Sequence, residues 1–321
     1  MSNLQRLNKL RDRLEGCYIT VPTMFRDDDL ELDLDATRAH SRFLLSRGAA
    51  EGNAVLLAAG AAGDFSAMSI EERCAVARAV VEEVNGAAPV AMGAQTTSTR
   101  DLITLAKAAE AIGVDYIQVS CPFYFSHTEQ DFFEFVKAAA EAAPNTGIII
   151  YNTFWTSKNV SFDMVEKLAD IPNVVGLKWA APRTDAMEFE HVCKHFSKRL
   201  SIIDNNLFFT MSHMMGARAF EVHLCNYWPE WGLKLMDRLG QRDYPEVQRM
   251  LTDEAMPFYH LWMKIESEHT SGDGYLDKLC MELIGLPSSR CRPPTRDVRD
   301  LYREEARTMM LETGVPGVLK R

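Results

Sequence analysis

The sequence predicts one α/β fold, a (β/α)8 TIM barrel with a helical C-terminal extension, from three observations. Eight short runs rich in Val, Ile, Leu or Ala recur along the first 240 residues. Longer segments with helical spacing separate these runs, and the strand signals stop after about residue 240. The length of 321 residues exceeds the ~250 residues of a typical barrel, which leaves room for an extension. A doubly wound open sheet is the alternative, but it usually has fewer strands, and its Gly-rich dinucleotide fingerprint is missing.

The eight apolar runs are the predicted strands. Continuous apolar runs of this length are typical of parallel strands that are buried on both faces. Each parallel pair of strands needs a crossover connection, which is usually a helix. The predicted strands cover residues 17–22, 54–60, 89–94, 116–121, 147–152, 174–179, 201–206 and 219–226.

The segments between the runs carry helix signals. Ser69 and Glu72 form a predicted capping box. In such a box the serine hydroxyl accepts a hydrogen bond from the amide of Glu72, and the glutamate side chain accepts one from the amide of Ser69. An apolar stripe at a spacing of three to four residues follows this box. The same stripe recurs before Gly113 and before Pro144.

The C-terminal part of the chain is predicted to be entirely helical. Helical patterns cover residues 244–268, 275–284 and 295–312, and segments rich in Gly and Pro separate them. We therefore expect residues 1–240 to form the barrel that carries the active site. Residues 241–321 are expected to form a helical extension that packs on the barrel.

Composition excludes several classes of protein. The sum of Lys and Arg is 35 and that of Asp and Glu is 45, a formal charge of −10, so a nucleic-acid partner is not expected. Seven scattered cysteines without a C-x-x-C pair predict reduced thiols in a cytoplasmic protein. The first residues do not read as a signal peptide, and no apolar stretch is long enough to cross a membrane. No motif for a metal or a cofactor is present, and neither is expected.

Lys178 is the first candidate for catalysis, because it stands near the end of the sixth apolar run. The pleat places Lys178 on the same face as Gly176, and both faces of a barrel strand are normally apolar. Gly176 is expected to leave room for the long lysine stem. Burial disfavours the charged ammonium, and the neutral amine is a nucleophile towards a carbonyl group. A lysine that reaches past the strand end to solvent is the other interpretation.

Two neighbouring features favour the catalytic interpretation. Tyr151 ends the fifth run, and adjacent strands lie about 4.8 Å apart, so its phenol and Lys178 can contact one substrate. Gly60, Ala61, Ala62 and Gly63 follow the second run, and their amides can hold a carboxylate without a cationic side chain. Taken alone, a tyrosine such as Tyr151 is more commonly a core residue, and the glycine-flanked segment is also consistent with a plain turn.

Together, these features resemble the dihydrodipicolinate synthase / N-acetylneuraminate lyase family of class I, Schiff-base aldolases. The resemblance runs from about Gly16 to the Arg-Pro-Pro that ends at Pro294. The order and spacing of its segments make the resemblance specific. These segments are TVPTMF at 20–25, GAAGD at 60–64 with EER at 71–73, CPFY at 121–124, YN at 151–152 and GLK at 176–178.

The resemblance implies a role for each matching residue. Lys178 is similar to the lysine that forms an imine with pyruvate or another 2-oxo acid, and Tyr151 to the tyrosine that shuttles protons. The turn at 60–63 resembles the carboxylate cradle of the family. Tyr124 matches a tyrosine that approaches the site from a neighbouring subunit in the synthases. The family is commonly tetrameric, which implies that this chain forms a homotetramer.

Departures from the family pattern point to the second substrate. Ala61 and Ala62 stand where the family usually has hydroxyl residues, and a lost hydrogen bond to a charged group is worth ~1.5–3 kcal/mol. The synthases carry an arginine a few residues after the motif tyrosine, and residues 151–156 contain none. Aromatic residues gather at the predicted strand ends instead, which suggests an apolar or aromatic second substrate. They are Phe65, Phe123, Phe154, Trp155, Trp179, Tyr227, Trp228 and Trp231. Packing of these rings against loops and the C-terminal helices is an equally open interpretation.

The resulting hypothesis is a class I, pyruvate-dependent aldolase or lyase that joins or cleaves a 2-oxo acid and an aldehyde. The aromatic strand ends resemble those of the hydratase-aldolases in the family. Asn152, Thr153 and Asn226 are expected to hold a water or hydroxyl beside the substrate. One alternative is a dehydratase of a 2-oxo-3-deoxy sugar acid that uses the same imine. The other is a barrel without catalysis that binds a 2-oxo acid.

Overall fold

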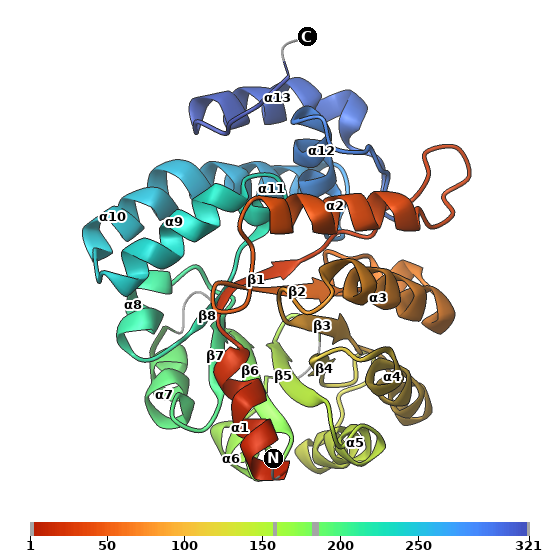
Figure 1. Cartoon of the computed structure of the whole chain (residues 1–321), viewed down its shortest axis with the longest axis vertical. Helices are drawn as coiled ribbons and strands as arrows, with labels where there is room; N and C mark the ends of the chain where they lie inside the picture. Colours follow the sequence, from red (N-terminus) through yellow and green to blue (C-terminus); the bar gives the residue numbers. More distant parts are fainter. Residues whose placement is uncertain (1–2, 157–158, 182–185, 320–321) are drawn as a thin grey trace. The chain divides into compact units, whose positions relative to one another are not determined.

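The computed structural model describes residues 3–156, 159–181 and 186–319, and it contains a closed eight-stranded barrel. The strands follow one another around the barrel in chain order, and β1 closes it by pairing in parallel with β8 (Figure 1). This confirms the predicted fold class. The strands are β1 (Gly16–Thr20), β2 (Ala54–Ala58), β3 (Val90–Gly93), β4 (Tyr116–Ser120), β5 (Gly147–Thr153), β6 (Val174–Ala180), β7 (Ser201–Asp204) and β8 (Ala219–Glu221).

Helices connect the strands and continue after the last one. The predicted capping box at Ser69 is present, with the amide of Glu72 bonded to the serine side chain. The helices are α1 (Asn3–Arg13), α2 (Leu34–Ser46), α3 (Ile70–Val84), α4 (Thr99–Ile112), α5 (Glu129–Ala142), α6 (Phe162–Leu168), α7 (Ala186–Phe196), α8 (Phe209–Met214), α9 (Pro229–Gly240), α10 (Tyr244–Arg249), α11 (Met256–Glu268), α12 (Tyr275–Leu283) and α13 (Arg299–Glu312). None of these described helices is long and apolar enough to cross a membrane.

The chain divides into two compact units. The first comprises residues 1–18, 50–57 and 86–221, and it contains the barrel strands except for the last residues of β1 and β2. The second comprises residues 19–49, 58–85 and 222–321, with α2, α3 and the helices from α9 onward. A domain boundary at residue 240, which the sequence suggested, stays a prediction.

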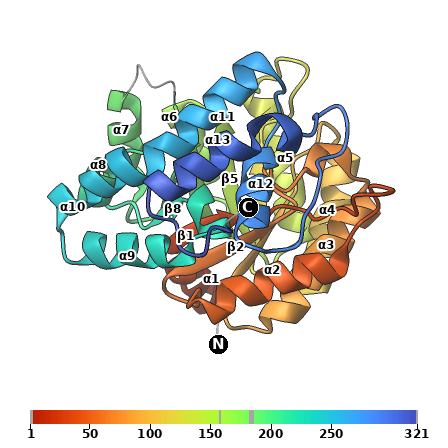
Figure 2. The same ribbon diagram turned by 90° about the horizontal axis from the view of Figure 1, so that it is seen from above.

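The C-terminal helices of the second unit pack on one another. Figures 1 and 2 show α13 beside α11 and α12. Ion pairs join them, because Lys264 on α11 lies 2.8 Å from Glu305 on α13, and Arg303 lies 2.7 Å from Glu282. The helical extension that the sequence predicted is therefore present. Its first predicted helix, 244–268, is interrupted by a π-helical turn at Met250–Ala255 between α10 and α11.

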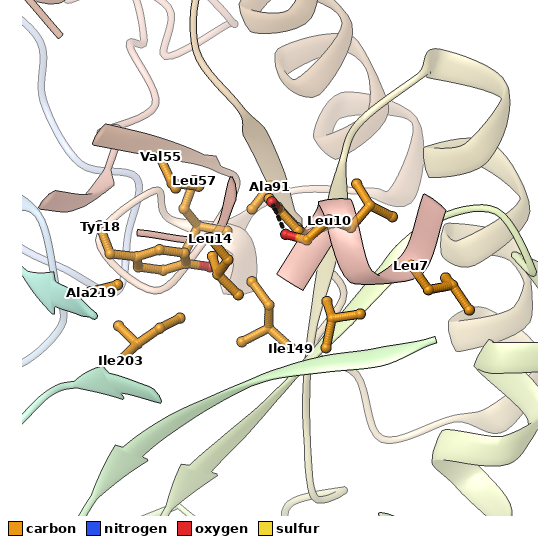
Figure 3. Close-up of a cluster of buried hydrophobic side chains, with 12 residues drawn as sticks. Leu7, Leu10, Leu14, Tyr18, Val55, Leu57, Ala91, Ile149, Ile203 and Ala219 are labelled. Carbon is orange, nitrogen blue, oxygen red and sulfur yellow. Dashed lines mark hydrogen bonds between the residues drawn. The ribbon is translucent and has the colours of Figure 1, made fainter. Parts of the chain in front are cut away.

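The floor of the barrel is closed by α1, a helix that the sequence analysis did not predict. Three leucines of this segment, Leu7, Leu10 and Leu14, enter the core between the strands (Figure 3). Tyr116 on β4 donates a hydrogen bond of 2.7 Å to the carbonyl of Leu10. A Cβ atom on Gly176 would collide with the Leu14 side chain. Gly176 therefore makes room for Leu14, which corrects the expectation that it accommodates the stem of Lys178.

The eighth strand is shorter than predicted. It ends at Glu221, and a 3-10 helix, His223–Asn226, takes the place of the predicted continuation. The Asn226 amide group donates to the carbonyl of Thr20 and to Asp277 on α12, at 3.0 and 2.9 Å. These tertiary hydrogen bonds turn the chain out of the strand, and the apolar letters of the run do not reveal them.

Candidate active site

The interior of the barrel changes from apolar to polar along the strands. Tyr116, Ile149 and Ala219 belong to the apolar core. Because alternate residues of a strand share a face, the residues two positions further along point into the same interior. These are Gln118, Tyr151 and Glu221, and Lys178 stands two positions beyond Gly176 in the same way. Four polar side chains thus form the next layer towards the carboxyl ends of the strands, where barrel enzymes carry their chemistry.

Lys178 and Tyr151 face each other across neighbouring strands. The register of β5 and β6 makes them direct partners. The Lys178 Nζ lies 4.5 Å from the centre of the Tyr151 ring, and both side chains are buried. The sequence analysis placed these two residues at one level, and the register agrees.

Glu221 is an ion-pair partner of Lys178 that the sequence analysis missed. The two side chains are buried, with 5% and 7% of their surface exposed, and Glu221 Oε2 lies 2.6 Å from Lys178 Nζ. A partner of opposite charge this close offsets part of the cost of burying the two charges. The signal was available, because Glu221 interrupts an apolar run just as Lys178 does.

Tyr18 completes the surroundings of the lysine. Its ring centre lies 5.2 Å from Lys178 Nζ, and β1 pairs Tyr18 with Glu221. Its hydroxyl donates a 3.0 Å hydrogen bond to Gln118 Oε1. Burial raises the pKa of Tyr18 well above its usual range, and the charge of Glu221 raises it further. Tyr18 is therefore a neutral phenol that keeps its proton.

The Tyr151 hydroxyl is held by the residue that follows β7. Asn205 Nδ2 donates to this oxygen at 3.2 Å. This hydrogen bond fixes the position of the phenol oxygen on the side of the barrel that Lys178 faces. Trp155, which is 56% exposed, stands edge-on to Tyr151 with ring centres 6.3 Å apart. Phe154 packs edge-on against Trp155.

The turn after β2 has the backbone of an anion cradle. Within the described part of the chain, the amides of Ala61 and Ala62 have no hydrogen-bond acceptor, whereas the amide of Gly63 bonds to Gly60 O at 3.2 Å. Gly63 is required by packing, because a Cβ atom there would lie 2.9 Å from Gly60 N and 3.1 Å from Val21 O. Two successive amides are therefore available to a carboxylate.

A second buried ion pair fixes the end of this turn. Asp64 has a left-handed backbone with φ of 55°, and its carboxylate lies 2.7 Å from Lys278 Nζ on α12. Lys278 also donates to the carbonyl of Arg290 at 2.9 Å. Burial raises the pKa of Asp64, and the neighbouring lysine opposes this shift. The pair joins sequence positions that are 214 residues apart.

Three predicted substrate contacts, Asn152, Trp179 and Asn226, have partners within the protein or lie in the core, and their contact with a substrate stays a prediction. Asn152 and Trp179 alternate with Tyr151 and Lys178 along their strands and so point out of the barrel interior. Asn152 Nδ2 donates to Ala180 O and to the Asn159 side chain, and its Oδ1 accepts the amide of Val160, so this side chain orders its own loop. Trp179 is 1% exposed and belongs to the core.

Asn226, the third of these residues, donates both protons of its side-chain amide to partners within the protein. It belongs to a buried network of the second unit with Asp277, His223 and His40. His223 Nδ1 lies 3.0 Å from Asp277 Oδ2, and His40 Nε2 donates to the Asn226 carbonyl at 2.9 Å. Burial lowers the pKa of His40 to about 4. A structural role accounts for this asparagine.

The remaining predicted residues differ in exposure. Thr153 shares the inward face of β5 with Tyr151. Its hydroxyl accepts a hydrogen bond of 2.7 Å from the Thr156 hydroxyl. Tyr124 is 87% exposed, with a positive φ of 86°, and its ring contacts that of the exposed Phe125. Neither aromatic residue contributes to the core of the described chain.

Comparisons with known proteins show the family and the fold of the chain. Residues 14–312 match the family described as the Dihydrodipicolinate synthetase family. A 4-hydroxy-tetrahydrodipicolinate synthase of Pseudomonas aeruginosa is 30% identical over 290 residues, which cover 88% of this chain and 96% of that protein. The crystal structure of dihydrodipicolinate synthase from Oceanobacillus iheyensis superposes with a TM-score of 0.83 at 24% identity, over 95% of this chain and 98% of that one.

Other relatives match differently. A 4-hydroxy-tetrahydrodipicolinate synthase of Desulforudis audaxviator is 35% identical, but the match spans only 53% of this chain and 56% of that protein. This chain thus spans about half the length of that relative. A probable 5-dehydro-4-deoxyglucarate dehydratase of Saccharopolyspora erythraea is 27% identical over 91% of this chain and 92% of its own length.

Proposed function

Because the chain belongs to the Dihydrodipicolinate synthetase family, we propose that it is a class I, Schiff-base aldolase. In this proposal it makes or cleaves a carbon–carbon bond between pyruvate, or a related 2-oxo acid, and an aldehyde. One observation carries the proposal: Lys178 is buried in the barrel interior with Tyr151 as its register partner. A buried amine beside a phenol is what imine chemistry on a carbonyl compound requires.

The reaction follows from the chemistry of these two residues. The Lys178 amine attacks the 2-oxo carbon, water leaves, and the iminium ion that forms is an electron sink. In the cleavage direction, Tyr151 acts as its phenolate and accepts the proton of the substrate hydroxyl, the adjacent carbon–carbon bond breaks, and the aldehyde departs. The bond electrons remain as an enamine on Lys178, which is protonated and hydrolysed to pyruvate. The Asn205 hydrogen bond keeps the Tyr151 oxygen in place during these transfers.

The turn at Gly60 to Gly63 is the proposed holder of the 2-oxo acid carboxylate. Two amides without acceptors, those of Ala61 and Ala62, support this role. Because both side chains are methyl groups, the turn supplies backbone donors and no hydroxyl. We therefore expect pyruvate to bind more weakly than it would at a turn with hydroxyl residues.

The proposed aldehyde is apolar or aromatic. The segment after Tyr151 contains no arginine, and it places the exposed Trp155 edge-on to the Tyr151 ring. Thr153 and Phe154 lie on the same segment, and Thr153 is the hydroxyl we assign to hold a water there. An aromatic segment without arginine suits a hydratase-aldolase, and condensation of pyruvate with aspartate semialdehyde is expected to be slow.

Oligomer and compartment are part of the proposal. Tyr124 and Phe125 are 87% and 70% exposed, which is unusual for adjacent large aromatic residues and suits a contact between subunits. We propose a homotetramer in which Tyr124 contacts a neighbouring copy. The seven cysteines are free thiols, and we propose a cytoplasmic location on that basis. No nucleic-acid or membrane partner is proposed.

A turnover panel tests the function. Pyruvate release is measured from aldol and unsaturated aryl pyruvate substrates and, for comparison, from sugar-derived 2-oxo acids. Condensation of pyruvate with aspartate semialdehyde is measured in a separate assay. The proposal predicts the fastest release from aryl compounds and no release in Lys178→Met. Equal or faster condensation with aspartate semialdehyde would contradict the assignment of the aldehyde.

A dehydratase is the second candidate. The Saccharopolyspora erythraea relative, named a probable 5-dehydro-4-deoxyglucarate dehydratase, matches over nearly the whole chain. The same Lys178 imine would acidify the carbon next to it, and loss of water would replace cleavage of the carbon–carbon bond. Release of water without pyruvate from a 2-oxo-3-deoxy sugar acid would favour this candidate.

A further inference from the structure

Glu221 is a buried carboxylate that the mechanism above does not use. It is the last residue of β8, and its Oε2 lies 2.6 Å from Lys178 Nζ on β6. β7 stands between these two strands and presents Ile203, the direct register partner of Lys178. The carboxylate therefore reaches past an apolar residue to contact the nucleophilic atom itself.

A purely structural role explains this pair poorly. Two charges lose their hydration when they are buried, and well-packed apolar residues usually serve stability as well as a buried ion pair does. The layer of the barrel just below is filled by apolar side chains such as Ile149 and Ala219. Burial alone does not decide the role of the pair, because Asp64 and Lys278 form a buried pair elsewhere. The pair of Lys178 and Glu221 differs in its place, since it lies towards the carboxyl ends of the strands, where barrel enzymes carry their chemistry.

The other groups around the pair leave Glu221 as the base nearest to the amine. The Tyr18 hydroxyl donates a hydrogen bond to Gln118, and the raised pKa of Tyr18 keeps this phenol neutral. Gln118 cannot exchange a proton at neutral pH, and in the described part of the chain its Nε2 has no hydrogen-bond partner. Tyr151 faces Lys178 from β5 and is assigned to the substrate hydroxyl. Glu221 alone among them is a carboxylate in contact with Nζ.

We propose that Glu221 is the catalytic acid and base of imine formation at Lys178, a role that rests on the proposed function. The carboxylate first accepts a proton from the Lys178 ammonium, and the free amine attacks the carbonyl carbon. The carbonyl oxygen takes a proton from the Glu221 carboxylic acid, and the new nitrogen–carbon bond leaves a positive nitrogen. That nitrogen returns a proton to Glu221, which yields a neutral carbinolamine.

Loss of water completes the step. The Glu221 carboxylic acid protonates the carbinolamine hydroxyl, the carbon–oxygen bond breaks, and the nitrogen lone pair forms the iminium ion. One ammonium and one carbonyl have become one iminium and one water, and Glu221 is again a carboxylate. It then faces the iminium cation as it faced the ammonium, so the site keeps the same charge throughout.

The same carboxylate has a second consequence for substrate binding. The carboxylate of a 2-oxo acid is bonded to the imine carbon, so it lies within about 5 Å of Glu221 once the imine has formed. Like charges this close repel one another in a site of low polarity. Removing the charge of Glu221 should therefore slow imine formation and, at the same time, strengthen the binding of pyruvate.

The test is the rate of reductive trapping of pyruvate on the whole protein, followed by intact mass. The comparison includes the wild type, Glu221→Gln, Glu221→Asp and Glu221→Ala with and without added formate. Glu51→Gln is the matched control, because it removes a carboxylate from a surface ion pair with Arg13. Glu221→Gln is expected to slow trapping ~10²–10⁴-fold and to lower the KM for pyruvate. Glu221→Asp should recover part of the rate, and formate should accelerate Glu221→Ala.

The outcomes separate the two proposals. No pyruvate adduct in the wild type would overturn the proposed function, and this role with it. An adduct that forms in Glu221→Gln at the wild-type rate would overturn the role of Glu221 alone. Thermal unfolding of each variant is followed alongside, and if Glu221→Gln does not fold, the slower trapping by Glu221→Asp decides the question. Formate without effect on a folded Glu221→Ala would also contradict the role.

Discussion

Two buried lysines of this chain are each paired with a carboxylate, and their surroundings differ. Lys178 lies 2.6 Å from Glu221 and stands over the rings of Tyr18 and Tyr151. Lys278 lies 2.7 Å from Asp64, and it also donates to a backbone carbonyl, that of Arg290. Both lysine side chains are almost completely buried, at 5% and 2% exposure.

The difference shows what distinguishes a reactive lysine from a structural one. Lys278 joins a tight turn to α12, and a fixed backbone carbonyl accepts a hydrogen bond from its ammonium group. Lys178 stands near the end of a barrel strand, among groups that exchange protons. Burial and an ionic partner are common to both, and therefore neither property identifies the nucleophile. The nucleophile is identified by its position at a strand end and by a phenol at the same level on the neighbouring strand.

Exchanging each lysine for methionine is the strongest test of this comparison. Lys178→Met is expected to lower pyruvate turnover by ~10⁴-fold or more, since no amine remains to form the imine. Lys278→Met should retain turnover per folded molecule within about tenfold. Steady-state kinetics on both variants measures this. Comparable losses in the two variants would mean that the lysines are not functionally distinct.

Stability should respond in the opposite order. Lys278→Met leaves Asp64 buried without its partner, and breaking a buried pair in this way costs about 3–5 kcal/mol of unfolding free energy. Replacing both residues, as in Asp64→Leu with Lys278→Met, removes the unpaired charge and should restore much of this loss. Denaturant unfolding checks both variants. A single variant as stable as the wild type would show that Lys278 does not hold the turn.

His40 extends the comparison to pH. Burial lowers its pKa to about 4 from an ordinary value of 6.5, so between these values the unfolded chain binds the proton more readily. Stability from this group is complete above pH 6.5 and decreases as the pH falls towards 4, by about 3 kcal/mol in total. His40→Gln keeps a donor for the Asn226 carbonyl and should not show this part of the decrease. Unfolding curves from pH 4 to pH 7 measure the difference.

The smallest expected effect concerns the carboxylate cradle. Ala61→Thr adds a hydroxyl at the half-buried position of the turn and should strengthen pyruvate binding by ~1.5–3 kcal/mol, the value of a hydrogen bond to a charged group. Ala61→Val has the same shape without the hydroxyl and is the control. The KM for pyruvate is the readout. A threonine variant indistinguishable from the valine variant would argue that the turn does not hold the carboxylate.

The sequence was sufficient for the barrel because its strands are buried on both faces and so appear as unbroken apolar runs. It also placed Tyr151 beside Lys178, since two strand ends at one level follow from the order of the runs. The capping box at Ser69 was predicted for a similar reason, because all of its atoms lie within four residues. Local rules of this kind need no knowledge of distant contacts.

The features that the sequence analysis missed depend on contacts between distant residues. Asp64 and Lys278 are separated by 214 positions. The local sequence around either residue does not predict its contact with the other. The early end of β8 has the same origin, because Asn226 bonds to Asp277 across 51 positions. Glu221 is a different case: strand alternation would have found it, had the run at 219–226 been read residue by residue.

Reductive trapping with pyruvate tests the central claim most directly. Borohydride reduction in the presence of pyruvate, followed by peptide mass mapping, reports which amine carries the imine. The account predicts a single adduct on Lys178, with none on Lys278 and none in Lys178→Met. An adduct on another lysine, or no adduct with pyruvate or any other 2-oxo acid, would contradict it.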